Sequence, residues 1–463
     1  MRSSMSYAAQ MFRSSFISFK ALSVDVLKFG PKFSKTLAEL EKSQWYTKEQ
    51  FDALQSGKFE ALIRHAYENV PYYRKTFDRL KLTPEDIKTP ADLKKLPVLD
   101  KATLRNNPHD FVARNISRLD RFPGWTTGTT GTPLNALRTK RSIAAENAMI
   151  WRQRRLAGLS YRCRKVAVWG TIWENVIIPA RQRVPPFWQY NLTDNQLLFS
   201  YYHMSDETLP VYIRRLEAFA PELIEGFPST LLVLARYLRK VNKVIPVKGI
   251  FTSSETLYDV HRKELEESFG TKVFDLYGQA ERVVAATECE KHAGLHINPE
   301  YGIFEILKDG MDAAPGTMGE VIGTGLNNFV MPLIRYRTGD LATLTKHSCA
   351  CGREMPLLAG IQGRKGDVIR TPDGRIVPGN GLMGAFHDIA NIKRSQIIQE
   401  KLDHVVVNLQ REEPTGPVDT DRLRTNLALC LGECVRIEFR LVDEIDNQGK
   451  SKFRWVTSHV PAE

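Results

Sequence analysis

The sequence predicts an α/β protein in which a large N-terminal domain precedes a small α+β domain. With 463 residues, the chain is about three times as long as a typical single domain. From Val166 onward, short apolar runs alternate with helical patterns, as in parallel β-α units that place helices on both faces of a sheet. Residues 300–345 instead resemble hairpin strands punctuated by Gly and Asp, which indicates a distorted β-barrel-like subdomain.

The predicted elements follow in chain order. Residues 45–105 are expected to be helical, because apolar residues keep helical spacing from Lys58 until Pro71 stops the helix. The α/β core then consists of VAVWG (166–170), a helix over 206–219, LIEGF (223–227), a helix over 230–241, GIFTS (249–253), a helix over 260–269 and KVFDLYG (272–278). The hairpin-like strands are IFEIL (303–307), GEVIGTGL (319–326) and LATLT (341–345).

Three regions follow from these patterns. Residues 1–44 are predicted to be a basic N-terminal extension, 45–362 the large domain and 363–463 the small domain. The boundary is placed near Gly363, where glycines and charged residues cluster. The extension has no acidic residue before Asp25 and superficially matches a targeting peptide or a membrane-touching helix, but a frayed basic terminus is the preferred interpretation.

Composition excludes several classes of protein. Hydrophobic residues make up 42% and charged residues 25%, as in ordinary globular proteins. The net charge of +12 is spread along the chain without a basic 5-to-8-mer or a nucleic-acid motif, so no nucleic-acid partner is expected. No apolar run reaches 18 residues, and six cysteines are too few for a disulfide framework, so we expect no transmembrane segment and a cytoplasmic location.

A Gly/Thr-rich segment, WTTGTTGTPL, runs from Trp125 to Leu134. In such a turn, backbone N–H groups and Thr hydroxyls can converge on a phosphate group. It is not a P-loop of the GxxxxGK[ST] type, because no Lys follows the second glycine. The alternative interpretation is an ordinary surface turn.

The same segment resembles the phosphate loop of adenylate-forming enzymes, and five further motifs follow in that family's order. They are TSSETL (252–257), YGQAE (277–281), YRTGD (336–340), GRKGD (363–367) and GKSKFRWV (449–456). HAYENVPYYR (65–74), LPVLDKATLR (96–105) and GFPST (226–230) are similar to the phenylacetate-coenzyme A ligase branch, especially to its relatives in capsular-polysaccharide gene clusters. The resemblance covers residues 45–456.

The resemblance implies a two-step reaction. A carboxylate attacks the α-phosphate of ATP to give an acyl-adenylate and pyrophosphate, and a nucleophile then takes the acyl group while the small domain swings between the two steps. The implied cofactors are ATP and Mg²⁺, and the acceptor is coenzyme A, an amine, a carrier protein or a sugar. Aromatic residues within 166–230, among them Phe187, Trp188 and Tyr201, favour an aryl or otherwise apolar acid, although core packing is their ordinary role.

The resemblance also implies roles for individual residues. The β- and γ-phosphates would be held by Thr126, Thr127, Gly128, Thr129, Thr130 and Gly131. Thr132 and Leu134 stand where many relatives carry Lys, so the loop lacks positive charge. Tyr277 would stack on adenine, in a pocket that also includes Ser254, Glu255, Gly278 and Gln279.

Four further positions complete the implied site. Glu281 would hold Mg²⁺, and Asp340 would accept hydrogen bonds from the ribose hydroxyls. Arg364 would assist from the domain junction. Lys452 would stabilise the transition state, with Lys450 as a competing candidate because Ser451 replaces the usual glycine before Lys452.

A second group of residues could bind a metal. Cys349 and Cys351 follow the YRTGD motif, and Cys289 with His292 or His296 follows YGQAE. Three thiolates and an imidazole make a structural zinc site if these segments meet, whereas reduced cysteines packed as small hydrophobes are the alternative. Similar elements occur in the resembling branch, His296 is the preferred imidazole, and a full set of protein ligands would brace the fold.

The predicted function is therefore ATP-dependent acid activation followed by acyl transfer, in polysaccharide or secondary-metabolite biosynthesis. The motif-matching Glu281, Asp340 and Arg364 favour an enzyme. The missing loop lysine and the irregular GKSKFR segment favour the alternative, a catalytically silent nucleotide- or zinc-binding scaffold. The sequence identifies neither the acid nor the acceptor, and it leaves the oligomeric state open, with a homodimer as one option.

Overall fold

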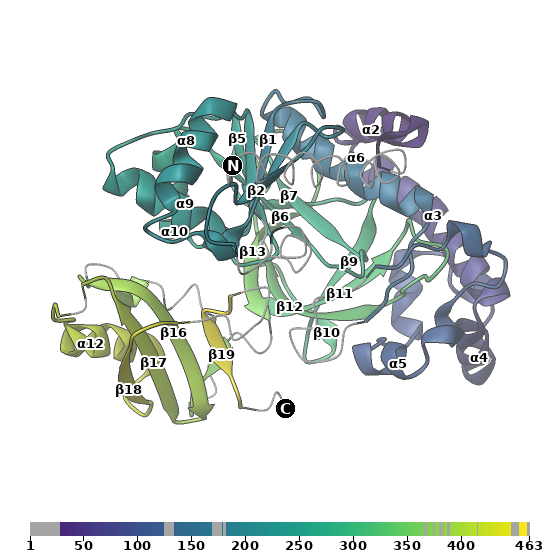
Figure 1. The fold of residues 1–463 in the computed structure, drawn as a ribbon. Helices are drawn as coiled ribbons and strands as arrows, with labels where there is room; N and C mark the ends of the chain where they lie inside the picture. The colour runs from purple at the N-terminus through teal and green to yellow at the C-terminus, as the bar shows by residue number, and fades with distance from the viewer. Residues whose placement is uncertain are drawn as a thin grey trace.

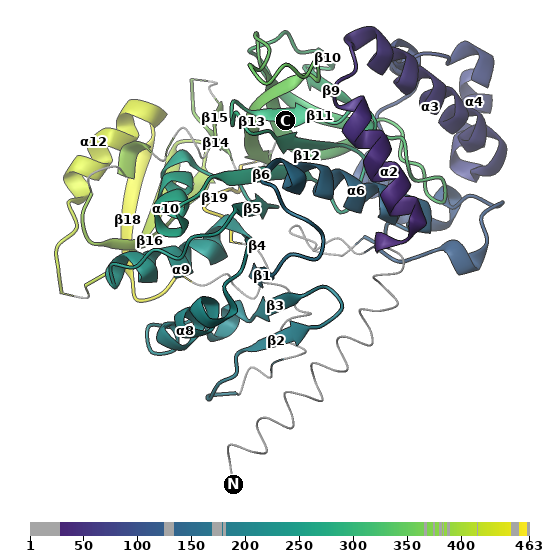
Figure 2. The ribbon, with the colours of Figure 1, turned by 90° about the horizontal axis from the view of Figure 1, so that it is seen from above.

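The computed structural model describes residues 28–124, 134–168, 178, 182–364, 368–373, 376–378, 382, 384–386, 389–413, 415–445 and 453–460. Figure 1 shows a large body of helices packed around a sheet and, beside it, a small body of strands with helix α12. Figure 2 shows the same two bodies from above. None of the described helices is long and apolar enough to cross a membrane.

The N-terminal part of the chain is helical. Its α-helices are α2 (Pro31–Ser43), α3 (Lys48–Asn69), α4 (Pro71–Leu80), α5 (Lys101–Asn106) and α6 (Lys140–Leu156). Helix α3 begins at Lys48, within the stretch predicted to be helical, because Thr47 and Gln50 form a capping box. Pro71 lies beyond the end of α3 and occupies the first turn of α4, where its missing N–H costs no hydrogen bond.

Helix α2 corrects the predicted N-terminal extension. Its buried Phe33, Leu37 and Leu40 belong to the same apolar cluster as Trp151 of α6. The two helices lie side by side in both views (Figures 1 and 2). Residues 31–43 therefore form part of the large domain, because burial of one apolar helix face fixes them against α6.

The centre of the large body is a sheet whose described strands run in the order β10-β9-β11-β12-β13-β8-β7-β6-β5-β4-β1-β3-β2. Its first six strands by sequence are β1 (Lys165–Val168), β2 (Trp188–Asn191), β3 (Gln196–Phe199), β4 (Leu223–Gly226), β5 (Gly249–Ser253) and β6 (Val273–Gly278). The neighbours β3-β1-β4-β5-β6 pair in parallel. This arrangement confirms the predicted parallel core.

Helices cover both faces of this parallel part. Helices α8 (Leu209–Phe219), α9 (Pro228–Lys240) and α10 (Asp259–Phe269) connect its strands. Along β5, Ile250 packs in the cluster that contains these helices, whereas the next residue, Phe251, packs in the cluster of α2 and α6. Because successive strand residues point to opposite faces, the two helix groups lie on opposite sides of the sheet.

The remaining strands extend the same sheet by antiparallel pairing. They are β7 (Ala285–Glu288), β8 (Leu295–Ile297), β9 (Gly302–Lys308), β10 (Met311–Asp312), β11 (Met318–Gly325), β12 (Tyr336–Leu344) and β13 (Leu357–Arg364). The predicted hairpin strands correspond to β9, β11 and β12. Register shifts between β11 and β12 and between β12 and β13 add twist, which curves this end of the sheet.

The C-terminal body has its own sheet and core. It contains β14 (Val368–Arg370), β15 (Ile376–Pro378), β16 (Ile392–Lys401), β17 (His404–Arg411), α12 (Thr420–Leu431), β18 (Arg436–Val442) and β19 (Val456–Ser458). Four of these strands form a sheet in the order β18-β17-β16-β19. Ile397, Val407, Leu423 and Leu427 pack together beneath it, which confirms the predicted small α+β unit, while the boundary near Gly363 stays a prediction.

Candidate functional site

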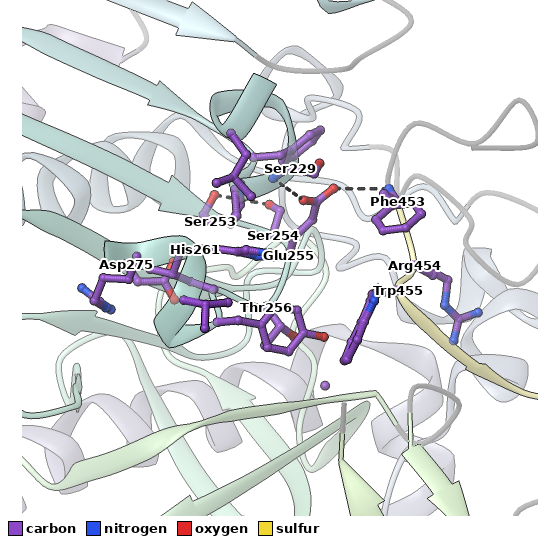
Figure 3. A pocket seen from close by; sticks show the side chains of 18 of the residues that line it. Ser229, Ser253, Ser254, Glu255, Thr256, His261, Asp275, Phe453, Arg454 and Trp455 are labelled. Carbon is purple, nitrogen blue, oxygen red and sulfur yellow. Dashed lines mark hydrogen bonds between the residues drawn. The ribbon is translucent and has the colours of Figure 1, made fainter. Parts of the chain in front are cut away.

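A cleft lies between the large sheet and the C-terminal sheet. Parallel strands β5 and β6 end at this cleft, so the residues at their carboxyl ends line it, as is usual for ligand sites in open α/β sheets. The C-terminal body contributes Phe453 and Trp455 to the opposite wall (Figure 3). The cleft brings together the predicted residues Ser254, Glu255, Tyr277, Gly278, Gln279, Glu281 and Asp340.

Other predicted residues fall outside the described part of the chain. These are Thr126, Thr127, Gly128, Thr129, Thr130 and Gly131 of the Gly/Thr segment, together with Lys450 and Lys452. Arg364 is described only by its backbone, which lies at the end of β13 opposite Asp340 in the strand register. The roles implied for these residues stay predictions.

Tyr277 and Asp340 form a buried pair at the cleft. The Tyr277 hydroxyl donates a hydrogen bond of 2.7 Å to Oδ2 of Asp340. Burial, and then the charge of Asp340, raise the pKa of Tyr277 well above its usual value, so the hydroxyl stays a donor. The Tyr277 ring also lies edge-on to Phe304, with 6.2 Å between centroids, so it belongs to the core as well as to the cleft wall.

Glu281 is held by two donors that the sequence did not identify. Its side chain is 9% exposed, and its Oε1 accepts hydrogen bonds from the Tyr336 hydroxyl at 2.8 Å and from Lys101 Nζ at 3.2 Å. Both donors lie within motifs, YRTGD and LPVLDKATLR, but neither motif pairs them with Glu281. A carboxylate oriented in this way at a cleft can bind a hard cation such as Mg²⁺.

Glu255 connects the two bodies. Its Oε2 accepts a hydrogen bond from the backbone N–H of Ser229 at 3.1 Å, and its Oε1 accepts one from the backbone N–H of Phe453 at 3.3 Å. Figure 3 shows Glu255 between these two residues. Close by, the rings of Tyr258 and Trp455 meet edge to face at 5.3 Å between centroids. The chain directly after Lys452 is therefore anchored to the large body.

The aromatic residues expected near the acid divide into two groups. Phe187 and Trp188 are buried in the apolar cluster of α8 and α9, so they have the ordinary role of core packing. Tyr201 and Phe227 line the cleft instead. The cleft thus has an apolar section beside the nucleotide-site candidates, as binding of an apolar acid requires.

The metal-site residues Cys289, His296, Cys349 and Cys351 come together at one place. Their ligand atoms all lie within 4.8 Å of one another. The Sγ atoms of Cys289 and Cys349 are 3.6 Å apart, and Cys351 Sγ is 3.4 Å from His296 Nε2. Tetrahedral zinc with Zn–S bonds of about 2.3 Å separates its ligands by about 3.5 to 3.8 Å, so the donor set and its spacing fit zinc.

The surroundings of this cysteine cluster affect the ionisation of its thiols. His292, the other imidazole considered, lies outside it, with Nδ1 3.6 Å from a carboxylate oxygen of Glu288. Burial raises the pKa of Cys289 to about 12, so this thiol would ionise at neutral pH only with a metal to displace its proton. Burial opposes ionisation of Cys351 too, but hydrogen bonds from Arg353 lower its pKa.

The chain is similar to Protein CapK and to phenylacetate-coenzyme A ligases. Residues 369–459 match the family described as the CapK C-terminal domain. Protein CapK of Staphylococcus aureus is 26% identical over 413 residues, which is 88% of this chain and 89% of CapK. A phenylacetate-coenzyme A ligase of Thermus thermophilus is 27% identical over 343 residues, which is 70% of this chain and 72% of the ligase. These similarities confirm the resemblance seen in the motifs.

Among solved structures, the fold matches 2-hydroxyisobutyryl-CoA ligase. In the postadenylation state of that ligase, in complex with R3-HIB-AMP, the TM-score is 0.71 at 20% identity, covering 90% of this chain and 91% of the ligase. In its thioesterification state, with 2-HIB-AMP and CoA, the TM-score is 0.56 at 21% identity over the same shares. The chain therefore shares the fold of this ligase, and its TM-score is higher against the postadenylation-state structure.

Proposed function

We propose that this chain, a homologue of Protein CapK and of the phenylacetate-coenzyme A ligases in the adenylate-forming superfamily, activates a carboxylic acid with ATP and passes the acyl group to coenzyme A. The observation that carries the proposal is the meeting of Asp340 and Glu281 at one cleft. Each is buried, and each is oriented by a tyrosine hydroxyl. Two fixed carboxylates suit a ligand that presents both hydroxyl groups and a cation-bound phosphate chain.

In the first step, an oxygen of the substrate carboxylate attacks the α-phosphorus of ATP. The bond from that phosphorus to the bridging oxygen breaks, and pyrophosphate leaves with the electron pair. Asp340, fixed by Tyr277, accepts the ribose hydroxyl protons as hydrogen bonds and so orients the nucleotide for this displacement. Glu281 would hold Mg²⁺, which when bound neutralises charge on the phosphates.

In the second step, the thiol of coenzyme A attacks the acyl carbon. The bond from that carbon to the phosphate oxygen breaks, AMP leaves with the electron pair, and the thiol proton is lost. The cleft between the two bodies offers a route for this acceptor. Tyr201 and Phe227 line the same cleft, which supports an apolar or aryl acid as the substrate. An amine, a carrier protein or a sugar would occupy the same place in the reaction.

The cysteine cluster has a separate, structural role in this proposal. Zinc bound by Cys289, His296, Cys349 and Cys351 would have four protein ligands and no open position for a substrate. It would link β7, β8 and the turn before β13. The reduced thiols that such a site needs persist in a reducing compartment, which supports a cytoplasmic location. A place in polysaccharide or secondary-metabolite biosynthesis is supported by the resemblance to capsular-polysaccharide relatives.

The test is acid-dependent exchange of labelled pyrophosphate into ATP, run over aryl, fatty, hydroxy and amino acids. This assay reports the first step without the acceptor. Exchange with an apolar or aryl acid is expected, and the responding acid can then be supplied with coenzyme A to detect a thioester. Binding of ATP without exchange on any acid would contradict the proposal and favour a nucleotide-binding scaffold.

A further inference from the structure

The triphosphate of ATP and the departing pyrophosphate carry several negative charges that a site must balance. The Gly/Thr segment at residues 125–133, WTTGTTGTP, contains no Lys or Arg. Backbone N–H groups and hydroxyls supply dipoles but no full positive charge. Any full positive charge that the protein adds to that of the proposed Mg²⁺ therefore comes from side chains outside this segment.

Arg138 lies beside Phe122 and Gly124, which precede that segment in the chain. Residues Phe122 and Arg138 pair through two backbone hydrogen bonds of 2.8 Å each. The Arg138 guanidinium crosses Gly124 so closely that a Cβ at this position would overlap it. Its Nη2 donates to the carbonyl oxygen of Ala280 at 2.8 Å, directly before Glu281. Arg138 thus contacts both Gly124 and the residue before Glu281, the predicted magnesium ligand.

Arg282 lies on the other side of Glu281 in sequence. Its backbone has a φ of 56°, in the left-handed region, which turns the chain sharply after the YGQAE motif. Its Nε is 3.7 Å from Glu146, whose other carboxylate oxygen accepts the Tyr301 hydroxyl proton. The Glu146 carboxylate therefore interacts with both Tyr301 and Arg282, and its distance from Arg282 is long for an ion pair.

The charges at this end of the cleft are unbalanced. Lys101 is paired with Glu281, and Arg282 with Glu146, but Arg138 forms no ion pair with any described residue. Arg138 Nε and Arg282 Nη1 are buried and have no hydrogen-bond partner in the described part of the chain. Burial, and then the charge of Arg282, lower the pKa of Arg138 to about 10, so it is still cationic at neutral pH.

We propose that Arg138 and Arg282 bind the β- and γ-phosphates of ATP and the departing pyrophosphate. When the bond between the α-phosphorus and the bridging oxygen breaks, the electron pair moves onto pyrophosphate, and the two guanidinium groups neutralise the charge there. Guanidinium groups suit this task, because they stay charged and donate in a planar fork to phosphate oxygens. This inference rests on the proposed function and assigns the cationic part of its nucleotide site.

The test compares ligands that differ only in the β- and γ-phosphates. The full-length variants Arg138→Gln and Arg282→Gln are titrated with ATP, AMP and inorganic pyrophosphate by calorimetry. Arg141→Gln is the matched control, because it removes the same charge from the exposed start of α6. A lost charge-assisted contact should weaken ATP and pyrophosphate binding by about tenfold to a hundredfold, while AMP binding changes less than about twofold. Arg→Lys at each site should restore part of the loss.

Other outcomes overturn the inference in distinguishable ways. Equal weakening for AMP and ATP would mean that the arginines support the fold of the cleft and not the phosphates, and unchanged ATP binding would remove their role. Wild-type protein that binds neither ATP nor pyrophosphate would refute the proposed function together with this inference. If the wild type binds ATP and the arginine variants bind it with the same affinity, only the arginine inference is refuted.

Discussion

At the scale of single residues, two tyrosines determine how the cleft carboxylates can act. Tyr277 donates to Asp340, and Tyr336 donates to Glu281. A neutral donor orients a carboxylate without cancelling its charge, whereas Lys101 also neutralises Glu281. Mg²⁺ at Glu281 would therefore share the carboxylate with Lys101, whereas the Tyr277 hydroxyl would orient Asp340 toward the ribose hydroxyls that we propose it binds.

This difference predicts graded effects on acid-dependent pyrophosphate exchange. Glu281→Ala and Asp340→Ala should each abolish adenylation, because each removes a group with a direct role. Tyr277→Phe removes only the hydroxyl that orients Asp340, so exchange should fall by about tenfold, with a higher KM for ATP and an unchanged KM for the acid. A Tyr277→Phe variant with wild-type KM for ATP would show that Asp340 needs no such support.

The raised pKa of Asp275 leads to a prediction about how stability depends on pH. Burial, and then the neighbouring Glu288 carboxylate, raise the pKa of Asp275 from 3.8 to about 7, although Thr252 donates to it and Arg262 lies nearby. Because the folded-state pKa is raised, the stabilising contribution of this group is present below pH 3.8 and is lost as pH rises through about 7. The Tm of the Asp275→Asn variant should therefore rise relative to that of the wild type as pH increases from 4 to 7.

The measurement is a series of thermal unfolding curves for both proteins at pH 4 to 8. Glu267→Gln is a suitable control, because it removes an exposed carboxylate from α10 whose ion pair with Lys263 is long. A difference in Tm between Asp275→Asn and wild type that is constant with pH would contradict the assignment. It would mean that Asp275 titrates as an ordinary carboxyl group.

At the scale of elements, the cysteine cluster joins segments that share few other ties. Cys289 follows β7, His296 lies in β8, and Cys349 and Cys351 lie in the turn between β12 and β13. Strands β8 and β13 pair through only two residue positions, Leu357 with His296 and Leu358 with Leu295. A metal cross-link would add stability where strand pairing is short.

We therefore expect about one zinc ion per chain in protein purified without chelators. Cys351→Ser should lose the metal and lower Tm by several degrees, and chelation of wild type should do the same. Cys434→Ser is the control, because Cys434 is exposed in the C-terminal body. Elemental analysis that finds no metal in the wild type would contradict the site.

The elements also show what the sequence could predict. Strands β1, β4, β5 and β6 followed from alternating apolar runs, because a buried parallel sheet needs them. The helical stretch predicted from residue 45 contains α3, whose start at Lys48 is marked by the capping box of Thr47 and Gln50. Helix α2 was missed because a basic, terminal segment resembles a tail although Phe33 and Leu37 keep helical spacing.

The candidate site was predictable to a different degree. Tyr277, Glu281 and Asp340 were identified because the YGQAE and YRTGD motifs resemble those of adenylate-forming enzymes. Lys101 and Arg138 were not identified, because their contacts with the YGQAE motif join segments more than 140 residues apart. Such tertiary contacts leave no local pattern, so only the folded chain reveals them.

At the scale of the whole molecule, polar and ring contacts between described residues join the two bodies. Besides the Glu255 bond to Phe453 and the Tyr258–Trp455 ring contact, Arg236 Nη1 donates to the carbonyl oxygen of Lys393 at 3.0 Å. Contacts of this kind suit an interface that opens and closes, because each is partly exposed and individually weak. Phe453 directly follows Lys452, which is predicted to stabilise the first transition state, so we expect the Glu255 bond to couple the arrangement of the bodies to adenylate formation.

Glu255 provides the test of that coupling. Glu255→Ala removes the acceptor that fixes the Phe453 N–H, so the adjacent Lys452 should be positioned less often for adenylate formation. We expect adenylate formation to fall by about tenfold, while transfer from a supplied acyl-adenylate to coenzyme A stays within about twofold of wild type. Lys452→Ala should show the same separation of the two steps, and unchanged adenylation in that variant would shift the role to Lys450. If Glu255 acted only by lining the nucleotide pocket, both steps would weaken together, because AMP occupies the cleft in each. Equal losses in the two steps would therefore reject the coupling. The control is Arg239→Ala, which changes another residue of the cleft that takes no part in these contacts.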